Sequence, residues 1–157
     1  MAVYHSEISI KSKGENDIID ITEDVQNVVS NSGLKEGICN IFVAGSTGTI
    51  STIEYEPGLK QDFPRILEKI APKNQEYKHH LTWHDDNGRS HCKATLMGPS
   101  LTVPFQNSNI IHGSWQQLVF VELDTGPRNR NIIVQIVFIE LDTSPRNRNL
   151  IVQLVGE

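Results

Sequence analysis

The C-terminal part of the chain contains a near-exact internal repeat, and this repeat limits the possible folds more than any other feature. Residues 119–137 and 137–155 align at an offset of 18 residues. Each copy predicts a strand, an Asp-Thr-x-Pro-Arg-Asn-Arg-Asn turn and a second strand, so we expect tandem hairpins at 120–137 and 138–155. An even offset keeps the same side chains on the same face of a strand. Either copy therefore suits the same place in a sheet.

The two copies differ only by conservative exchanges, and their fusion creates one continuous strand candidate at 132–141. We expect the copies to compete for one position in the sheet. The other copy then becomes an added edge strand, a loosely ordered tail or a strand paired with a neighbouring subunit. The exchanges are Val121 to Ile139, Gly126 to Ser144, Ile132 to Leu150 and Ile136 to Leu154.

The rest of the chain predicts further strands and two main helices. Thr22 is a plausible N-cap for a first helix that stops near Gly33. Apolar residues at helical spacing predict a second helix over 59–70, closed by Pro72, with Pro64 delaying its start or kinking it. Alternation and short apolar runs predict strands at 4–11, 18–21, 38–44, 50–55, 91–97, 100–105 and 118–123.

Length and composition suit a single domain, residues 1–157, with a sizeable core. The net charge of −5 argues against a general nucleic-acid or membrane-surface binder, because both depend on basic patches. The sequence has no membrane-length apolar run and no signal-peptide pattern, so we expect a cytoplasmic protein. Cys39 reads as a small core residue, and alternation along a strand would turn Cys92 away from His91.

A polar, histidine-rich stretch at 77–103 is the first candidate for a functional site. It holds four of the six histidines, with Asp85 and Asp86 between them. Imidazole and carboxylate groups bind divalent metals and perform acid–base chemistry near neutral pH. The alternative is a loop of solvated histidines, since the spacing matches no strong metal motif. The histidines are His79, His80, His84 and His91.

A second candidate is the small-residue turn at 45–49, which is rich in hydroxyls and backbone N–H groups. Such a turn suits an anion such as phosphate, although a plain hairpin connection is the commoner role. The strand that follows delivers Glu54 and Glu56 to one end. The four arginines of the repeat turns suit phosphate contacts but are equally suited to a solvated surface. They are Arg128, Arg130, Arg146 and Arg148.

Six short segments together resemble the YjbQ family, small proteins also described as secondary thiamine-phosphate synthases. Each segment alone is weak, but jointly they are specific and cover nearly the whole chain up to the first hairpin copy. The family is about one hairpin shorter, which agrees with a duplicated C-terminal hairpin here. The segments are Ser-Thr-Gly-Thr at 46–49, Tyr-x-His at 77–79, Ser-His-Cys-Lys-Ala at 90–94, Leu-Met-Gly-Pro-Ser-Leu at 96–101, Gly-Ser-Trp-Gln at 113–116 and the final Val-Gln-Leu-Val-Gly-Glu.

The resemblance implies an α+β fold with a β-sandwich-like core, a homotrimer and a histidine cluster for a divalent metal, zinc first. Two of three recurrent family histidines match His79 and His91, and the third position holds Gly45 here. His84 is our candidate for the third metal ligand. His79, His91, Asp86 and Glu54 are the predicted catalytic residues, and the predicted phosphate-binding residues are Ser46, Thr47, Thr49, Arg89 and Lys93.

The implied reaction joins a pyrimidine pyrophosphate to a thiazole phosphate, giving thiamine phosphate and pyrophosphate. The partner is then a small phosphorylated metabolite. The alternative is a non-catalytic trimeric binding module for such a metabolite.

Overall fold

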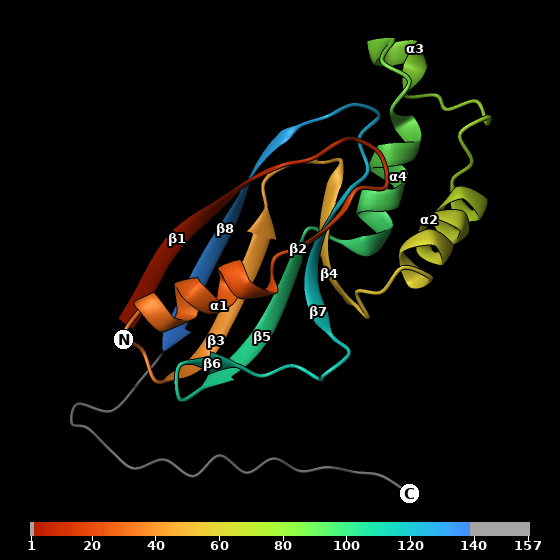
Figure 1. Cartoon of the computed structure of the whole chain (residues 1–157). Helices are drawn as coiled ribbons and strands as arrows, with labels where there is room; N and C mark the ends of the chain where they lie inside the picture. The colour runs from red at the N-terminus through yellow and green to blue at the C-terminus, as the bar shows by residue number, and fades with distance from the viewer. Residues whose placement is uncertain (1, 139–157) are drawn as a thin grey trace, which may run out of the picture.

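The computed structural model describes residues 2–138, which form two antiparallel sheets and a group of helices (Figure 1). The elements in chain order are β1 Ala2–Lys11, β2 Ile18–Asp20, α1 Thr22–Asn31, β3 Glu36–Val43, β4 Gly48–Ile53, α2 Leu59–Ile70, α3 His80–Trp83, α4 Gly88–Met97, β5 Ser100–Gln106, β6 Asn109–Ile110, β7 Gln117–Glu122 and β8 Asn129–Phe138. None of the helices in this range is long and apolar enough to cross a membrane.

The larger sheet has the strand order β1-β8-β3-β5-β6, and the smaller sheet has the order β2-β7-β4. Strand β8 is enclosed between β1 and β3, so Ile132 lies opposite both Ile8 and Val43. Strand β7 is likewise enclosed between β2 and β4. The hairpin predicted at 120–137 is therefore wrong, because β7 and β8 pair in different sheets and not with each other. The connected segment β7–turn–β8 instead supplies an inner strand to each sheet. The fold is α+β with antiparallel sheets and few helices, as expected.

Two apolar clusters lie on the two faces of the smaller sheet. The larger cluster joins both sheets to α1, and Phe120 of β7 is fully buried in it. The smaller cluster joins the other face of β7, through Val119 and Val121, to Leu67 of α2 and Ala94 of α4. Strand β7 is buried on both faces for this reason, which explains its continuous apolar sequence. Figure 1 shows α2, α3 and α4 gathered together beyond the smaller sheet.

The predicted strand at 91–97 is wrong, because these residues belong to helix α4. The buried side chains on it are Arg89, Ser90, Lys93 and Ala94, which follow helical rather than alternating spacing. Three of the four are polar, so the helical stripe did not appear as an apolar pattern. Cys92 therefore does not lie on an opposite strand face from His91. It is exposed beside His91 on the helix.

The first helix confirms its predicted range but not its predicted cap. Thr22 is the first helical residue, and Ile21 occupies the N-cap position without a side-chain cap. Asp20 Oδ1 accepts a hydrogen bond from Thr22 N at 2.9 Å, and Thr22 Oγ1 accepts one from Leu118 N at 2.8 Å. Thr22 thus ties α1 to β7. Gly33 has a φ of 72°, which agrees with a stop at this glycine.

Helix α2 confirms the range 59–70, and Pro64 lies inside it without ending it. Its apolar stripe is only partly core, because Leu67 is buried whereas Ile66 and Ile70 are each about half exposed. Cys39 is fully buried, as predicted for a small core residue, and burial raises the pKa of its thiol to about 11.

The first repeat copy forms β7, its turn and β8 up to Phe138. Of the predicted strand at 132–141, the segment 132–138 is the end of β8, and the remainder lies outside the described residues. The second predicted hairpin, 138–155, also lies outside them apart from Phe138.

Candidate functional site

The rings of His79 and His91 lie next to each other, with their centroids 4.5 Å apart and their planes tilted by 47°. His79 precedes the short helix α3, and His91 is on α4. His79 Nε2 is 3.5 Å from Asp85 Oδ1. The two imidazoles singled out in the sequence therefore converge, with a carboxylate beside them.

Gly88 makes this approach possible. A Cβ at this position would lie 2.6 Å from Tyr77 Cβ and 3.1 Å from His79 Cβ, closer than packed carbon atoms tolerate. A glycine at the start of α4 thus lets the Tyr77–His79 segment pack directly against the helix. This local contact brings His79 to His91.

Asn87 is a site residue that the sequence reasoning missed. It is buried, and with its amide nitrogen facing the site it donates to His79 Nε2 at 3.2 Å and to Asp85 Oδ1 at 3.1 Å. In that arrangement His79 Nε2 is the acceptor, so the proton of the neutral ring is on Nδ1. The only sequence signal was the Asp-Asp-Asn run directly before a helix start.

Three other predicted residues lie apart from this pair. The His84 ring is 5.5 Å from the His80 ring, and His84 adopts a left-handed backbone with a φ of 59°. Asp86 is exposed, and its backbone oxygen accepts a hydrogen bond from Arg89 Nη1 at 2.7 Å. Glu54 is exposed just after β4. The catalytic and metal roles suggested for them stay predictions.

Arg89 and Lys93, both buried on α4, bind one carboxylate. Glu15 accepts hydrogen bonds from Arg89 Nε at 3.0 Å and Nη2 at 2.9 Å, and from Lys93 Nζ at 3.1 Å. Burial raises the pKa of the Glu15 carboxyl, but the hydrogen bonds and charges of the two cations together outweigh it, so this pKa is lowered. The hydrogen bond that Arg89 donates to Glu15, together with the negative charge of that carboxylate, raises the pKa of Arg89. No sequence pattern pointed to Glu15 as a site residue.

The neighbouring Ser90 is fully buried, and its Oγ has no hydrogen-bond partner among the described residues. The N-terminal half of α4 therefore places three buried polar side chains, Arg89, Ser90 and Lys93, near the histidine pair.

Two of the hydroxyl-bearing residues in the turn at 45–49 are buried and bind other parts of the protein. Ser46 is exposed, whereas Thr47 and Thr49 are buried. Thr47 Oγ1 donates to Asp124 Oδ2 at 3.2 Å and accepts from Arg130 Nη2 at 2.9 Å. Thr49 Oγ1 donates to the oxygen of Gly98, directly after α4, at 2.5 Å.

Behind the turn, the segment β7–turn–β8 carries two buried acids, Glu122 and Asp124, that pair with arginines. Arg130 binds Glu122, with Nε to Oε2 at 2.8 Å, and Arg128 Nε binds Asp124 Oδ2 at 2.8 Å. Burial raises the pKa of Asp124. Hydrogen bonds, first of all the one from Arg128, lower this pKa by more than burial raises it, so the pKa is lowered overall. Ser12 Oγ donates to Glu122 Oε2 at 2.7 Å. These two arginines therefore have structural partners.

The turn and α4 are connected through this cluster by backbone contacts. Leu123 N donates to the oxygen of Thr47, and Asn16 N donates to the oxygen of Glu122. Glu15, next to Asn16, then binds α4. Thus the turn at 45–49, the segment β7–turn–β8 and α4 meet at one end of the molecule. The contacts described above connect Thr47 to the two imidazoles only through intermediate residues.

The residues around His79 and His91 do not form a complete metal site. Within residues 2–138, no group of three or more histidine, cysteine, aspartate or glutamate side chains is arranged to hold a metal ion. The histidine pair offers two nitrogen ligands, whereas catalytic zinc sites use three protein ligands. We therefore derive no reaction step through a metal.

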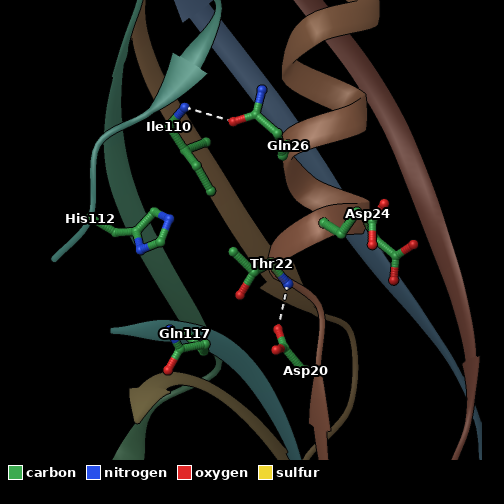
Figure 2. A pocket seen from close by; sticks show the side chains of 8 residues that line it. Asp20, Thr22, Asp24, Gln26, Ile110, His112 and Gln117 are labelled. Atoms are coloured by element: carbon green, nitrogen blue, oxygen red, sulfur yellow. Dashed lines mark hydrogen bonds between the residues drawn. The ribbon is translucent and has the colours of Figure 1, made fainter. Parts of the chain in front are cut away.

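A separate cavity of about 570 Å³ lies at the start of α1 (Figure 2). His112 and Gln117 line one side of it, and Asp20, Thr22 and Gln26 line another. Gln26 Oε1 accepts from Ile110 N at 3.0 Å, which fixes the wall between α1 and β6. None of the predicted site residues lines this cavity.

Comparison with known proteins identifies relatives along most of the described chain. A family model described as "UPF0047 protein YjbQ-like" matches residues 6–137. A UPF0047 protein of Methanothermobacter thermautotrophicus is 40% identical over 134 residues, covering 85% of this chain and 92% of the relative. The UPF0047 protein YugU of Bacillus subtilis is 30% identical over 129 residues, covering 82% and 95%.

Solved structures show the same fold. A YbjQ-like protein of unknown function from Sulfolobus solfataricus has a TM-score of 0.80 and is 36% identical, covering 86% of this chain and 96% of that one. A hypothetical protein from Aeropyrum pernix has a TM-score of 0.79 and is 26% identical, covering 85% and 98%.

Proposed function

The chain belongs to the YjbQ-like UPF0047 family, and from this premise we propose that it is an enzyme acting on phosphorylated metabolites. The candidate reaction joins a pyrimidine pyrophosphate to a thiazole phosphate. The observation that carries the proposal is the close approach of His79 and His91 beside Asp85. Such a pair suits transfer and stabilisation of charge near neutral pH.

The reaction forms one bond and breaks one. The thiazole nitrogen attacks the methylene carbon of the pyrimidine, forming a C–N bond. The C–O bond to pyrophosphate breaks, and its electron pair leaves with the pyrophosphate. A protonated imidazole donates a hydrogen bond to the leaving oxygens, where negative charge develops. Asp85 Oδ1, 3.5 Å from His79 Nε2, adds a carboxylate beside the pair.

The cations of α4 support the phosphate-binding part of the proposal. Arg89 and Lys93 carry two positive charges, and the largely buried carboxylate of Glu15 contacts both. Glu68 and Asp86 lie farther away, at 3.8 and 3.9 Å, and water screens their more exposed carboxylates. The exposed Ser46 adds a hydroxyl and a backbone N–H at the neighbouring turn.

The test is formation of thiamine phosphate from the two precursors. We expect His79→Ala and His91→Ala each to lower kcat at least about 100-fold, the usual range for loss of an acid–base group. His112→Ala removes a histidine from the separate cavity of Figure 2 and serves as the matched control. Wild-type activity in both site variants would remove the proposed roles.

One observation favours the second candidate, a binding module without turnover. The carboxylates of Asp86 and Glu54 are exposed, and among the described residues Asp85 is the carboxylate that forms an ion pair with His79. Calorimetric binding of phosphorylated ligands, together with no turnover in the wild type, would favour this candidate.

We propose the assembly to be a homotrimer. The outer face of the larger sheet supports self-association, because residues 2–138 leave apolar side chains uncovered there. Val3 is 55% exposed, Ile38 49% and Phe42 37%. The cytoplasmic location expected from the sequence stays a prediction.

A further inference from the structure

Asn87 contacts both histidines of the candidate site, one with its side chain and the other with its backbone. Its amide nitrogen donates to His79 Nε2 at 3.2 Å. Its carbonyl oxygen, at the N-cap position of α4, accepts a hydrogen bond from His91 N at 3.3 Å. We propose that Asn87 is a positioning residue that fixes the tautomer of His79 and thereby decides which ring nitrogen is left to bind a substrate.

The orientation of the Asn87 amide follows from its contact with Asp85. One end of the amide lies 3.1 and 3.2 Å from the two carboxylate oxygens of Asp85. An ionised carboxylate only accepts hydrogen bonds, so the end that faces it is the NH₂ group and not the oxygen. The NH₂ group has two hydrogens, and it can therefore donate to Asp85 and to His79 Nε2 at the same time.

The distances around His79 Nε2 favour one tautomer of the neutral ring. A proton on Nε2 would have Asp85 Oδ1 as its acceptor, but these atoms are 3.5 Å apart, longer than an ordinary N–H···O hydrogen bond. The Asn87 amide is closer, at 3.2 Å. Nε2 is therefore the acceptor, and the proton is on Nδ1. This is the minor tautomer of histidine in water, so the protein has to impose it.

Burial makes the amide of Asn87 hard to replace by water. Asn87 is only 8% exposed, whereas the side chains of His79 and Asp85 are 28% and 41% exposed. Without the amide, a ring nitrogen and a carboxylate would face each other with no donor between them. The unmatched acceptors would cost more than the hydrogen bond itself contributes. Asn87 also begins a helix, and a helix holds such a geometry better than a loop does.

His79 Nδ1 is the nitrogen that remains for a ligand. Within residues 2–138 it forms no hydrogen bond with another residue, and the ring is partly exposed. The Nδ1–H group of a neutral imidazole can donate to an oxygen on which negative charge develops, so His79 need not be protonated to act. The assignment of this donor to the leaving pyrophosphate rests on the proposed function. The tautomer itself is a property of the free protein.

Nitrogen-15 NMR of the full chain with labelled histidine measures the tautomer, because protonated and unprotonated ring nitrogens give well-separated signals. At about pH 9, above the ordinary pKa of histidine, we expect the Nδ1–H form of His79 to predominate. His112 is the internal control. Its Nδ1 lies 3.0 Å from the oxygen of Gly113, so its Nδ1–H form is independent of Asn87. A predominant Nε2–H form of His79 in the wild type would overturn the proposal.

Two variants test whether Asn87 imposes this tautomer. Asn87→Leu removes the amide, and the ratio of the Nδ1–H to the Nε2–H form of His79 should fall about five- to tenfold, the value of one hydrogen bond. The double variant Asp85→Asn with Asn87→Asp exchanges the amide and the carboxylate at unchanged net charge. The carboxylate at position 87 then accepts from Nε2–H, so the tautomer should invert. A ratio that stays at the wild-type value in both variants would contradict the proposal.

The double variant also separates tautomer control from a merely structural role. It keeps the hydrogen bonds and the charge, so a structural role predicts wild-type kcat. Tautomer control predicts a kcat about tenfold lower or more, with a smaller change in KM, because the Nδ1–H donor is lost. Wild-type kcat with an inverted tautomer would overturn the proposed role. If the wild type makes no thiamine phosphate, the proposed function fails, whereas the NMR measurements still decide whether Asn87 fixes His79.

Discussion

Glu15 lies in an ordinary polar loop, yet it binds two cations that the fold buries. The side chains of Arg89 and Lys93 are 3% and 1% exposed, and each contacts the Glu15 carboxylate within 3.1 Å. Without this carboxylate, two positive charges would remain buried with only half-exposed acids nearby. The contribution of Glu15 to stability therefore depends on its two partners, which are 74 and 78 residues away in sequence.

We expect Glu15→Gln to lower the free energy of unfolding at pH 7 by about 3–5 kcal/mol, the usual cost of breaking a buried ion pair on one side. Glu68→Gln is the matched control. Its carboxylate is 3.8 Å from Lys93 and half exposed, so its loss should cost about 1 kcal/mol or less. Urea unfolding of both variants measures the difference. Equal small losses would show that Glu15 is not the main counterion.

The effect of Glu15→Gln should depend on pH in one direction. The folded pKa of Glu15 is lowered, so its stabilisation is complete above the ordinary carboxyl pKa and is lost as the pH falls through the folded value. The gap between wild type and variant should be constant from pH 7 to about 5 and shrink below about 4. A gap that widens on acidification would contradict this assignment.

At the scale of elements, α4 carries the chemistry of the candidate site. One helix presents His91 to His79, buries Arg89 and Lys93 against Glu15, and contributes Ala94 to the smaller apolar cluster. The start of the helix is fixed by the close packing of Tyr77 and His79 against Gly88. The geometry of the histidine pair therefore depends on how tightly this segment docks on α4.

We expect Gly88→Ala to separate His79 from His91 and to destabilise the protein by about 1–3 kcal/mol, as overpacking does. A new Cβ would meet Tyr77 Cβ at 2.6 Å, so the segment at 77–79 must move. Gly126→Ala is the control, since an added Cβ there meets nothing within 4 Å. Histidine NMR shifts report the ring contact. Unchanged shifts of both rings in Gly88→Ala would rule out this packing role.

At the scale of the whole molecule, the layers formed by the described residues leave the outer face of the larger sheet open. The smaller sheet is covered by the larger sheet on one face and by α2 and α4 on the other. The inner face of the larger sheet is buried, whereas its outer face keeps Val3, Ile38 and Phe42 exposed. An exposed apolar face of this kind is typical of a surface that another subunit covers.

If the proposed trimer uses this face, Ile38→Glu should produce monomers, because a charge there would be buried without a partner. Light scattering measures the mass of the particle. Ile66→Glu, an equally exposed position on α2, is the control and should leave the assembly unchanged. An Ile38→Glu protein with the wild-type mass would place the interface elsewhere.

Much of the fold was predictable because the spacing of apolar residues along the chain indicates these strands and helices. Strand β1, with its alternating wet and dry faces, and helices α1 and α2 have nearly the predicted bounds. Helix α4 was not predictable, because its buried positions include Ser90 and Lys93, and their burial depends on a carboxylate in a distant loop. Local pattern cannot show a buried charge whose partner is 78 residues away.

The candidate site divides in the same way. The histidines were found because they cluster in sequence, and His79 and His91 do meet. Asn87, Glu15 and Glu122 were missed, since each is an ordinary polar residue until the fold buries it beside a partner. Thr47 was expected to bind an anion. In the structure its hydroxyl forms hydrogen bonds with Asp124 and Arg130 of the segment β7–turn–β8.

By itself, the sequence determined the antiparallel strands, the two main helices, the repeat and the identity of the histidine pair, because these depend on periodicity and local composition. The tertiary structure alone decided that 88–97 is a helix, that Glu15 neutralises Arg89 and Lys93, and that β7 is buried on both faces. Those features depend on contacts between segments far apart in the chain. Burial then sets the energy of each charge, and only the folded chain defines burial.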